Sequence, residues 1–319
     1  MFNIVKNRKL YFLISLAIII PGMIAMLYNI ITLPTHTPWR LSVDFKEGTR
    51  LVLKFNQPVS EDQLRAALAA EGMQNPSVSR LGADADNAWQ VRTDFLEDAR
   101  AEAVRNTIST KVAPLDLAQS SVESVGARVA NEVTSAAFWA VIAAAIAVLL
   151  FIWYAFRRAQ HALRYSVCAI IAMVHDILVV GGLTALACIF LGWEVDALFL
   201  TAMLTVIGFS VQDTIVVYDR IRENLIRHRG EPFGQIVTRS LVETLHRSLA
   251  LSLVNIFVMV ALMLFGGASI KQFVAVLLFG LVSGAYSSIF NAVPLVVAWE
   301  ERSLFGRPDD SAVAVPSKA

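Results

Sequence analysis

Two aspartates, Asp176 and Asp213, stand inside long apolar stretches of the chain and are the first candidates for chemistry. A third ionisable residue, Arg247, begins another apolar stretch. A charged side chain at the centre of a bilayer costs about 2.5–3.5 kcal/mol on insertion scales, so such residues are expected to form pairs or to carry a function. These three residues therefore define the first candidate site.

Asp213 and Arg247 predict a proton relay. Burial favours the protonated form of an aspartate, whereas a nearby arginine favours the ionised form. If the arginine approaches and withdraws as helices move, the carboxylate alternately releases and binds a proton. Two alternatives stay open. In the first, Asp213 is a structural carboxylate that is hydrogen-bonded to polar neighbours such as Ser210 and Gln212. In the second, Arg247 only extends its charged end to the lipid headgroups.

His175 directly precedes Asp176, and this pair has two interpretations. It either locks the packing of neighbouring helices or carries a proton itself. The small residues Gly181-Gly182 and the range Gly280–Gly284 indicate close approach of helices rather than a ligand site.

Ser210 with His175, or the two aspartates together, would be the reactive pair of an intramembrane protease. The surrounding residues disfavour this alternative. Aspartyl proteases of the presenilin type carry Gly-x-Gly-Asp, whereas Ser210-Val211-Gln212 precedes Asp213 here. The chain is therefore not expected to be an enzyme.

The composition is that of a membrane protein. Hydrophobic residues make up 56% of the chain and charged residues 17%, against about 25% charged residues in ordinary soluble domains. The net charge of +1 gives no sign of a nucleic-acid partner. The sequence has no Cys/His cluster with metal-ligand spacing and no glycine-rich phosphate loop, so no metal or nucleotide cofactor is expected.

Six stretches are long and apolar enough to cross a membrane, since a spanning helix needs about 20 mainly apolar residues. They occupy residues 10–32, 135–156, 165–191, 196–218, 247–265 and 272–299. The first is too long for a signal peptide and is expected to be retained. Basic residues gather at the amino end and after the second, fourth and sixth stretches, which predicts that both termini lie in the cytoplasm.

The segment 34–133 is more polar and predicts a small domain outside the cytoplasm. Its pattern predicts strands over 49–55, 76–81, 88–93 and 120–125 and helices over 61–70 and 97–112. Ser60 and Gln63 predict a capping box, and the range 82–84 predicts a hairpin turn. The order β-α-β-β-α-β is that of the ferredoxin-like fold. The domain has no convincing catalytic set, so a binding or mechanical role fits it better.

The expected fold is an α-helical polytopic membrane protein, a six-helix bundle with one α+β ferredoxin-like extracytoplasmic domain. Its parts are the cytoplasmic N-terminus with the first span (1–33), the extracytoplasmic domain (34–133), the remaining spans (134–300) and a cytoplasmic tail (301–319). Basic and apolar residues alternate near 219–246. This alternation predicts that Arg220–His246 forms an amphipathic helix lying along the membrane, with its face against anionic lipid or the channel.

One long motif resembles the signature of a known family. It runs Gly208-Phe209-Ser210-Val211-Gln212-Asp213-Thr214-Ile215-Val216-Val217-Tyr218-Asp219-Arg220-Ile221-Arg222-Glu223-Asn224. This motif resembles the end of the fourth span in the SecD/SecF family. Similar family motifs occur at Val43-Asp44-Phe45, Val174-His175-Asp176, Thr244-Leu245-His246-Arg247 and Leu264-Phe265-Gly266-Gly267. The resemblance covers almost the whole chain.

The resemblance implies a subunit of the bacterial plasma membrane that pairs with SecD, joins the SecYEG channel and uses the proton gradient to help export preproteins. It also implies similarity to one half of a resistance-nodulation-division exporter. The family residues that match Asp213 and Arg247 are implicated in proton transport, with protons as the coupling ion and no other cofactor. The alternative is a passive scaffold or insertion factor that only stabilises its partners, and the two hypotheses differ at Asp213.

The sequence departs from the family pattern in two places. Gly48 is the one glycine kept where the family has two after Asp-Phe. Apolar residues replace several hydroxyl residues of the fifth span, which leaves Ser248, Ser252 and Asn255. A hydrated path along that span is therefore expected to be narrower or to run elsewhere.

Overall fold

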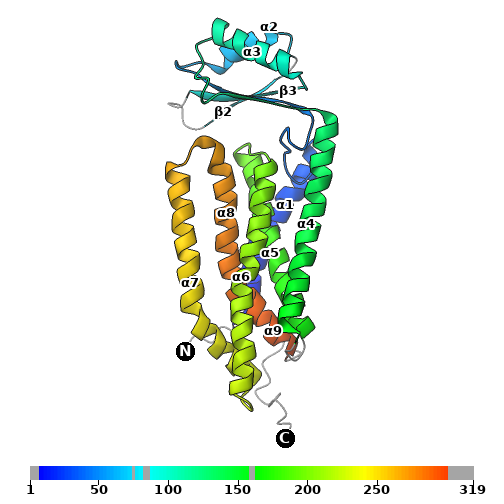
Figure 1. The fold of residues 1–319 in the computed structure, drawn as a ribbon, viewed down its shortest axis with the longest axis vertical. Helices are drawn as coiled ribbons and strands as arrows, with labels where there is room; N and C mark the ends of the chain where they lie inside the picture. Colours follow the sequence, from blue (N-terminus) through cyan, green and yellow to red (C-terminus); the bar gives the residue numbers. More distant parts are fainter. Residues whose placement is uncertain (1–6, 74–75, 82–86, 158–161, 301–319) are drawn as a thin grey trace. The chain divides into compact units, whose positions relative to one another are not determined.

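The computed structural model describes residues 7–73, 76–81, 87–157 and 162–300, and the chain divides into two compact units (Figure 1). Unit 1 holds Met1–Arg40, Ala140–Glu194 and Leu198–Ala319. Unit 2 holds Leu41–Trp139 and Val195–Ala197. The turn predicted at 82–84 and the tail predicted at 301–319 lie outside the described residues.

Unit 1 is helical. Its elements are α1 (Arg8–Thr32), α4 (Ala127–Phe156, which begins in unit 2), α5 (Ala162–Phe190), α6 (Ala197–Arg227), α7 (Phe233–Phe265), α8 (Ala268–Ser287), η2 (Ser288–Ala292) and α9 (Val293–Glu300). In the described part of the chain, 6 helices are long and apolar enough to cross a membrane, the last made of α8, η2 and α9. The six spans predicted from hydropathy are confirmed.

Glycines let the helices of unit 1 approach one another closely. A Cβ atom added to Gly22 of α1 would lie 2.6 Å from the Cα atom of Gly182 on α5. A Cβ atom added to Gly280 of α8 would overlap the side chain of Val206 on α6. Because lipid gives little hydrophobic drive for helix association, small residues that permit such contacts stabilise the bundle. The prediction that Gly182 and Gly280 mark close packing is confirmed.

The connection between the fourth and fifth spans differs from the prediction. α6 continues to Arg227 and α7 begins at Phe233, so no separate amphipathic helix forms over Arg220–His246. Asn224 Nδ2 donates to Ser240 Oγ at 3.0 Å, which joins the two helices. The apolar residues of the pattern that belong to the core of unit 1 are Ile221, Phe233, Val237 and Leu241. The alternation therefore reflects a helical hairpin with a shared core.

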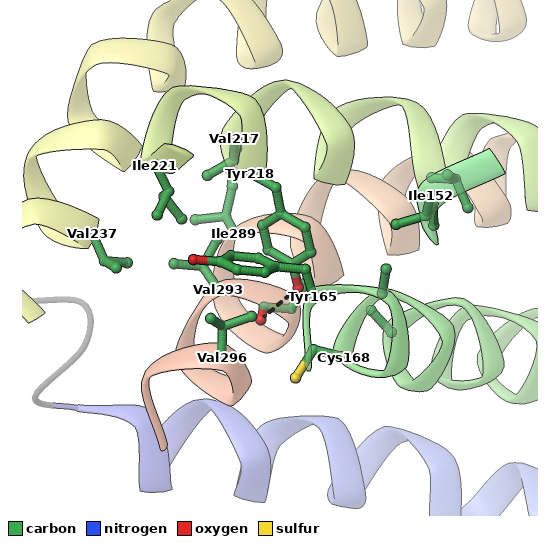
Figure 2. Close-up of a cluster of buried hydrophobic side chains, with 14 of the residues drawn as sticks. Ile152, Tyr165, Cys168, Val217, Tyr218, Ile221, Val237, Ile289, Val293 and Val296 are labelled. Atoms are coloured by element: carbon green, nitrogen blue, oxygen red, sulfur yellow. Dashed lines mark hydrogen bonds between the residues drawn. The ribbon is translucent and has the colours of Figure 1, made fainter. Parts of the chain in front are cut away.

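The sixth span changes its helical pitch at the π-helix η2. Tyr218 of α6 is fully buried, and its hydroxyl donates to the carbonyl oxygen of Ala292, the last residue of η2, at 3.0 Å. Figure 2 shows the rings of Tyr218 and Tyr165 lying among Ile289 and other apolar side chains of the sixth span. No sequence pattern predicted this π-turn. The bond ties α6 to the place where the pitch changes.

Unit 2 is an antiparallel sheet with two helices packed against it. Its elements are β1 (Gly48–Lys54), α2 (Glu61–Ala70), β2 (Ser77–Leu81), β3 (Ala88–Thr93), α3 (Asp98–Lys111) and β4 (Ser121–Val125). The sheet has 4 strands in the order β2-β3-β1-β4. Leu51, Leu53 and Val91 from the strands pack with Leu64 of α2 and Ile108 of α3 in the core. The predicted β-α-β-β-α-β order is confirmed.

Two local signals in unit 2 behave as the sequence predicts. Ser60 Oγ accepts from Gln63 N at 3.3 Å, and Gln63 Oε1 accepts from Ser60 N at 3.1 Å, which is a complete capping box. Gly48 has a φ angle of 154°, and a Cβ atom there would lie 3.0 Å from the Thr93 carbonyl oxygen. The single glycine that the chain shares with the family pattern therefore stands at a position where the backbone conformation requires glycine.

Candidate functional site

Asp176 is the centre of a buried polar network in unit 1, and the residue is only 1% exposed. Its Oδ2 accepts from Ser210 Oγ at 2.5 Å and from Ser287 Oγ at 2.6 Å. Its Oδ1 accepts from Ser283 Oγ at 2.6 Å. All three hydroxyls lie at short hydrogen-bond distance from the carboxyl oxygens. The carboxylate thereby joins α5, α6 and α8.

His175 completes this network. Its Nδ1 lies 3.0 Å from Asp176 Oδ1. Nδ1 donates to the carboxylate in one tautomer of the imidazole and accepts from a carboxylic acid in the other. The other nitrogen, Nε2, is buried and has no hydrogen-bond partner in the described part of the chain.

A second group of polar side chains links α1 to the sixth span. Ser15 Oγ donates to Asn291 Oδ1 at 3.0 Å and lies 3.4 Å from Tyr286 Oη. The Tyr286 ring in turn lies 6.2 Å from the His175 imidazole, centroid to centroid. These contacts extend the polar interior of unit 1 from Asp176 to α1.

Asp213 has a different environment, although it follows Ser210 by only three positions on α6. It is half-buried, and its Oδ2 accepts from Ser252 Oγ of α7 at 3.2 Å. The alternative that Asp213 bonds to Ser210 is wrong, because Ser210 donates to Asp176. A cavity borders the Asp213 carboxylate. Its lining residues are Phe209, Gln212, Asp213, Leu251, Ser252, Asn255, Leu281, Gly284 and Ala285.

The structure does not pair Arg247 with Asp213. Arg247 is exposed, and among the described residues it forms no ion pair within 4.0 Å. It precedes Ser252 by five positions on α7, which corresponds to about 7.5 Å along the helix axis. Ser252 therefore occupies the position at the carboxylate that the relay hypothesis gives to the arginine, and the relay stays a prediction.

The sequence missed two members of the Asp176 network. His175, Asp176 and Ser210 were identified in advance, whereas Ser283 and Ser287 were not. A signal was available, because these two serines stand four positions apart on α8, each next to a small residue. Such spacing places them on one face of the helix.

The hydrolytic pair of Ser210 and His175 considered from the sequence does not form. Both side chains bond to the Asp176 carboxylate. Within the residues that the structure describes, no group of three or more His, Cys, Asp or Glu side chains could hold a metal ion.

The polar end of the long motif holds two helices together. Arg220 Nε donates to Glu243 Oε2 at 2.6 Å, and Asn224 Nδ2 donates to the same oxygen at 2.8 Å. Asn224 is buried. This part of the motif therefore fixes α6 against α7 at the end of the hairpin, beyond the segment that carries Asp213.

Comparisons with known proteins give the family context of this site. Residues 104–302 match the family model described as protein export membrane protein SecD/SecF, C-terminal. The protein translocase subunit SecF of Thermobaculum terrenum is 43% identical over 326 residues, which cover 98% of this chain and 100% of that protein. The protein translocase subunit SecF of Anaerolinea thermophila is 42% identical, with 94% of each chain covered.

The fold is also similar to a solved structure. The crystal structure of SecDF, a translocon-associated membrane protein from Thermus thermophilus, matches with a TM-score of 0.77 and 28% identity. The match covers 94% of this chain and 38% of the SecDF chain, so this chain spans well under half of that protein's length. SecDF in a super-membrane-facing form matches with a TM-score of 0.59 and 26% identity, over 94% of this chain and 39% of that chain.

Proposed function

The chain belongs to the SecD/SecF family of protein-export membrane proteins, and from that premise we propose that it couples the proton gradient to preprotein export. It is a multi-pass protein of the bacterial membrane with an accessory role in Sec translocation, and it is not an enzyme. The observation that supports proton coupling is the environment of Asp213. Its carboxylate is half-buried within a span and borders a cavity with polar side chains.

Asp213 suits proton exchange better than a fully bonded carboxylate does. One hydroxyl, that of Ser252, holds it at 3.2 Å, which is long for an O–H···O bond. The cavity beside it carries the polar side chains of Gln212 and Asn255. A proton that crosses a potential of about 100 mV carries roughly 2.3 kcal/mol, which is enough to bias two conformations that differ by a few kcal/mol.

Arg247 supplies the second state of the proposed relay. In the conformation described here, Ser252 contacts the carboxylate and the guanidinium is exposed. A shift of α7 relative to α6 would exchange the hydroxyl for the guanidinium, and the nearby positive charge would then favour release of the proton. In this proposal, the present conformation belongs to the proton-binding half of the cycle.

We place both termini in the cytoplasm and unit 2 outside it. The support is the basic residues around the α6–α7 connection, with Arg222 and Arg227 at the end of α6 and Arg229 in the connection itself. The range 192–196 on the opposite side has no basic residue. The proposed partners are SecD, the SecYEG channel, the preprotein in transit and membrane lipids. Unit 2 is proposed to contact the preprotein after it leaves the channel.

Export of a preprotein into proteoliposomes tests this function. The vesicles contain the channel, SecD and this chain, with or without an imposed proton gradient. Asp213→Asn keeps the size of the side chain and removes its titration, so the gradient-dependent part of export should disappear. Asp219→Asn is the matched control, because Asp219 is an exposed carboxylate on the same helix whose ion pair with Arg222 contributes little.

The result separates coupling from scaffolding. A scaffold gains nothing from a titrating carboxylate, so gradient stimulation of Asp213→Asn equal to that of Asp219→Asn, per assembled complex, would contradict the proposal. The passive scaffold would then be the better account of this subunit.

A further inference from the structure

The hydrogen bonds around Asp176 can hold an ionised carboxylate without a cation. Ser210, Ser283 and Ser287 each direct the single hydrogen of a hydroxyl at its oxygens. No arginine or lysine among the described residues forms an ion pair with it, and His175 is the basic group in contact. In its ionised form the carboxylate is therefore held by hydrogen bonds from rearrangeable donors and not by a fixed cation.

Two of these donors have a second arrangement available. His175 Nε2 is buried and has no hydrogen-bond partner in the described part of the chain, so it can accept a proton. Ser287 Oγ lies 3.4 Å from the Gly284 carbonyl oxygen and can donate there instead of to Asp176. The network can therefore accept a proton without leaving a hydroxyl hydrogen unbonded.

We propose that Asp176 is a second proton-binding site of this chain and that His175 loads it. A proton binds at His175 Nε2, the hydrogen on Nδ1 passes to Asp176 Oδ1, and the neutral imidazole is left in its other tautomer. The imidazole then accepts from the carboxylic acid. Release follows the same steps in reverse.

Protonation of Asp176 loosens the contact of α8 with α5 and α6. Hydrogen bonds to an ionised acceptor are about twice as strong as those between neutral groups, so the three serine bonds weaken together. Gly284, which lies against the Ser210 backbone, also borders the Asp213 cavity. Loading Asp176 thus changes the packing beside Asp213, and this regulatory role rests on the proposed function.

The titratable groups on the surrounding elements are few. On α5 there is His175, on α6 Asp213 lies one turn beyond Ser210, and on α8 Tyr286 lies beside the imidazole. From α1, Tyr11 accepts the Tyr286 hydroxyl hydrogen at its carbonyl oxygen, at 2.8 Å. The imidazole is thus the group in direct contact with Asp176 that can supply a proton.

Infrared difference spectroscopy of the full chain in lipid vesicles tests this site, because a protonated carboxyl has its own carbonyl stretching band. In Asp213→Asn protein, acidification should produce a buried carboxyl band that is lost when Asp176→Asn is added. Adding Ser283→Ala instead should shift the band frequency, since one carboxyl oxygen loses its donor. Thr205→Ala is the matched control and should shift nothing, because that hydroxyl bonds to its own helix.

The outcomes decide each part of the proposal. If no component of the band depends on Asp176 or Ser283, Asp176 does not bind a proton. The Ser283→Ala arm keeps this conclusion available even if Asp176→Asn does not fold. His175→Gln should slow the rise of the band after a rapid pH change by at least about tenfold, and an unchanged rate would remove His175 from the path. The spectroscopic measurement does not depend on export. Its result for Asp176 is therefore independent of the export result for Asp213.

Discussion

Ser210 and Asp213 lie one helical turn apart on α6 yet bond to different helices. Ser210 donates to Asp176 of α5 at 2.5 Å, whereas Asp213 accepts from Ser252 of α7 at 3.2 Å. One short segment of α6 therefore contributes to a closed polar network on one side and to an open cavity on the other. Because a helix moves as a rigid element, a shift of α6 that alters one bond alters the other.

Because α8 approaches α6 closely, one added methyl group at Gly280 is predicted to lower the stability of the protein markedly. Gly280→Ala places a Cβ atom into the side chain of Val206, and overpacking of this kind costs about 1–3 kcal/mol. The apparent Tm of the purified protein in detergent should fall. Adding Val206→Ala makes room for the new methyl group and should restore part of the loss.

Gly208→Ala is the matched control for Gly280→Ala. A Cβ atom on Gly208 meets nothing within 4 Å, and alanine is the better helix former by about 1 kcal/mol. This variant should match or exceed the Tm of the unsubstituted protein. Equal Tm values for the two variants would show that the α6–α8 contact does not limit stability.

The proposed orientation predicts opposite labelling of two engineered cysteines. Ser79 is exposed on β2 of unit 2, and Arg229 lies in the connection between α6 and α7. In intact spheroplasts, an impermeant thiol reagent should label Ser79→Cys and should leave Arg229→Cys unmodified until the cells are lysed. The two natural cysteines, Cys168 and Cys188, are buried and give little background. The reverse pattern would invert the topology.

The elements predicted correctly are those encoded by local sequence. The capping box of Ser60 and Gln63 depends on residues three positions apart, and both of its hydrogen bonds form. The six spans follow from apolar length alone. Such signals act within one helix, so no knowledge of the packing partner is needed.

The features that sequence reasoning missed depend on contacts between distant segments. Ser283 joins the site only because α8 places it against Asp176, which is 107 positions earlier in the chain. Asn224 lies in the range predicted to form an amphipathic helix, but its side chain donates to Ser240 of α7. Single-sequence periodicity shows which residues share a face of a helix, but it does not show which helix covers that face.

The capping box predicts a local loss of stability in unit 2. Ser60→Ala removes the acceptor for the Gln63 backbone N–H, which should cost about 1 kcal/mol. Hydrogen exchange of the first-turn amides of α2 in the full chain should become faster. Gln63→Glu keeps a side-chain acceptor at the same position and should preserve their protection. If Ser60→Ala left the exchange rate of these amides unchanged, the box would not hold the first turn of the helix.

The last prediction concerns Arg247. In the proposed relay, this residue acts in a second conformation, in which its guanidinium contacts Asp213. Arg247→Met keeps an apolar stem of similar length and removes the charge that favours proton release from Asp213. Gradient-stimulated export should therefore fall to the level of Asp213→Asn, with normal assembly, because a proton that is bound but never released drives no cycle.

Arg247→Lys separates charge from geometry. A lysine supplies a point charge without the planar fork that an arginine offers to a carboxylate. If charge alone releases the proton, this variant should keep most of the stimulation, and if a two-point contact is needed it should resemble Arg247→Met. Arg229→Met, which removes a basic residue from the same hairpin, is the control. Full stimulation in Arg247→Met would contradict the relay, because Asp213 would then release its proton without the arginine, while Ser252 donates to its carboxylate from α7 as the structure shows.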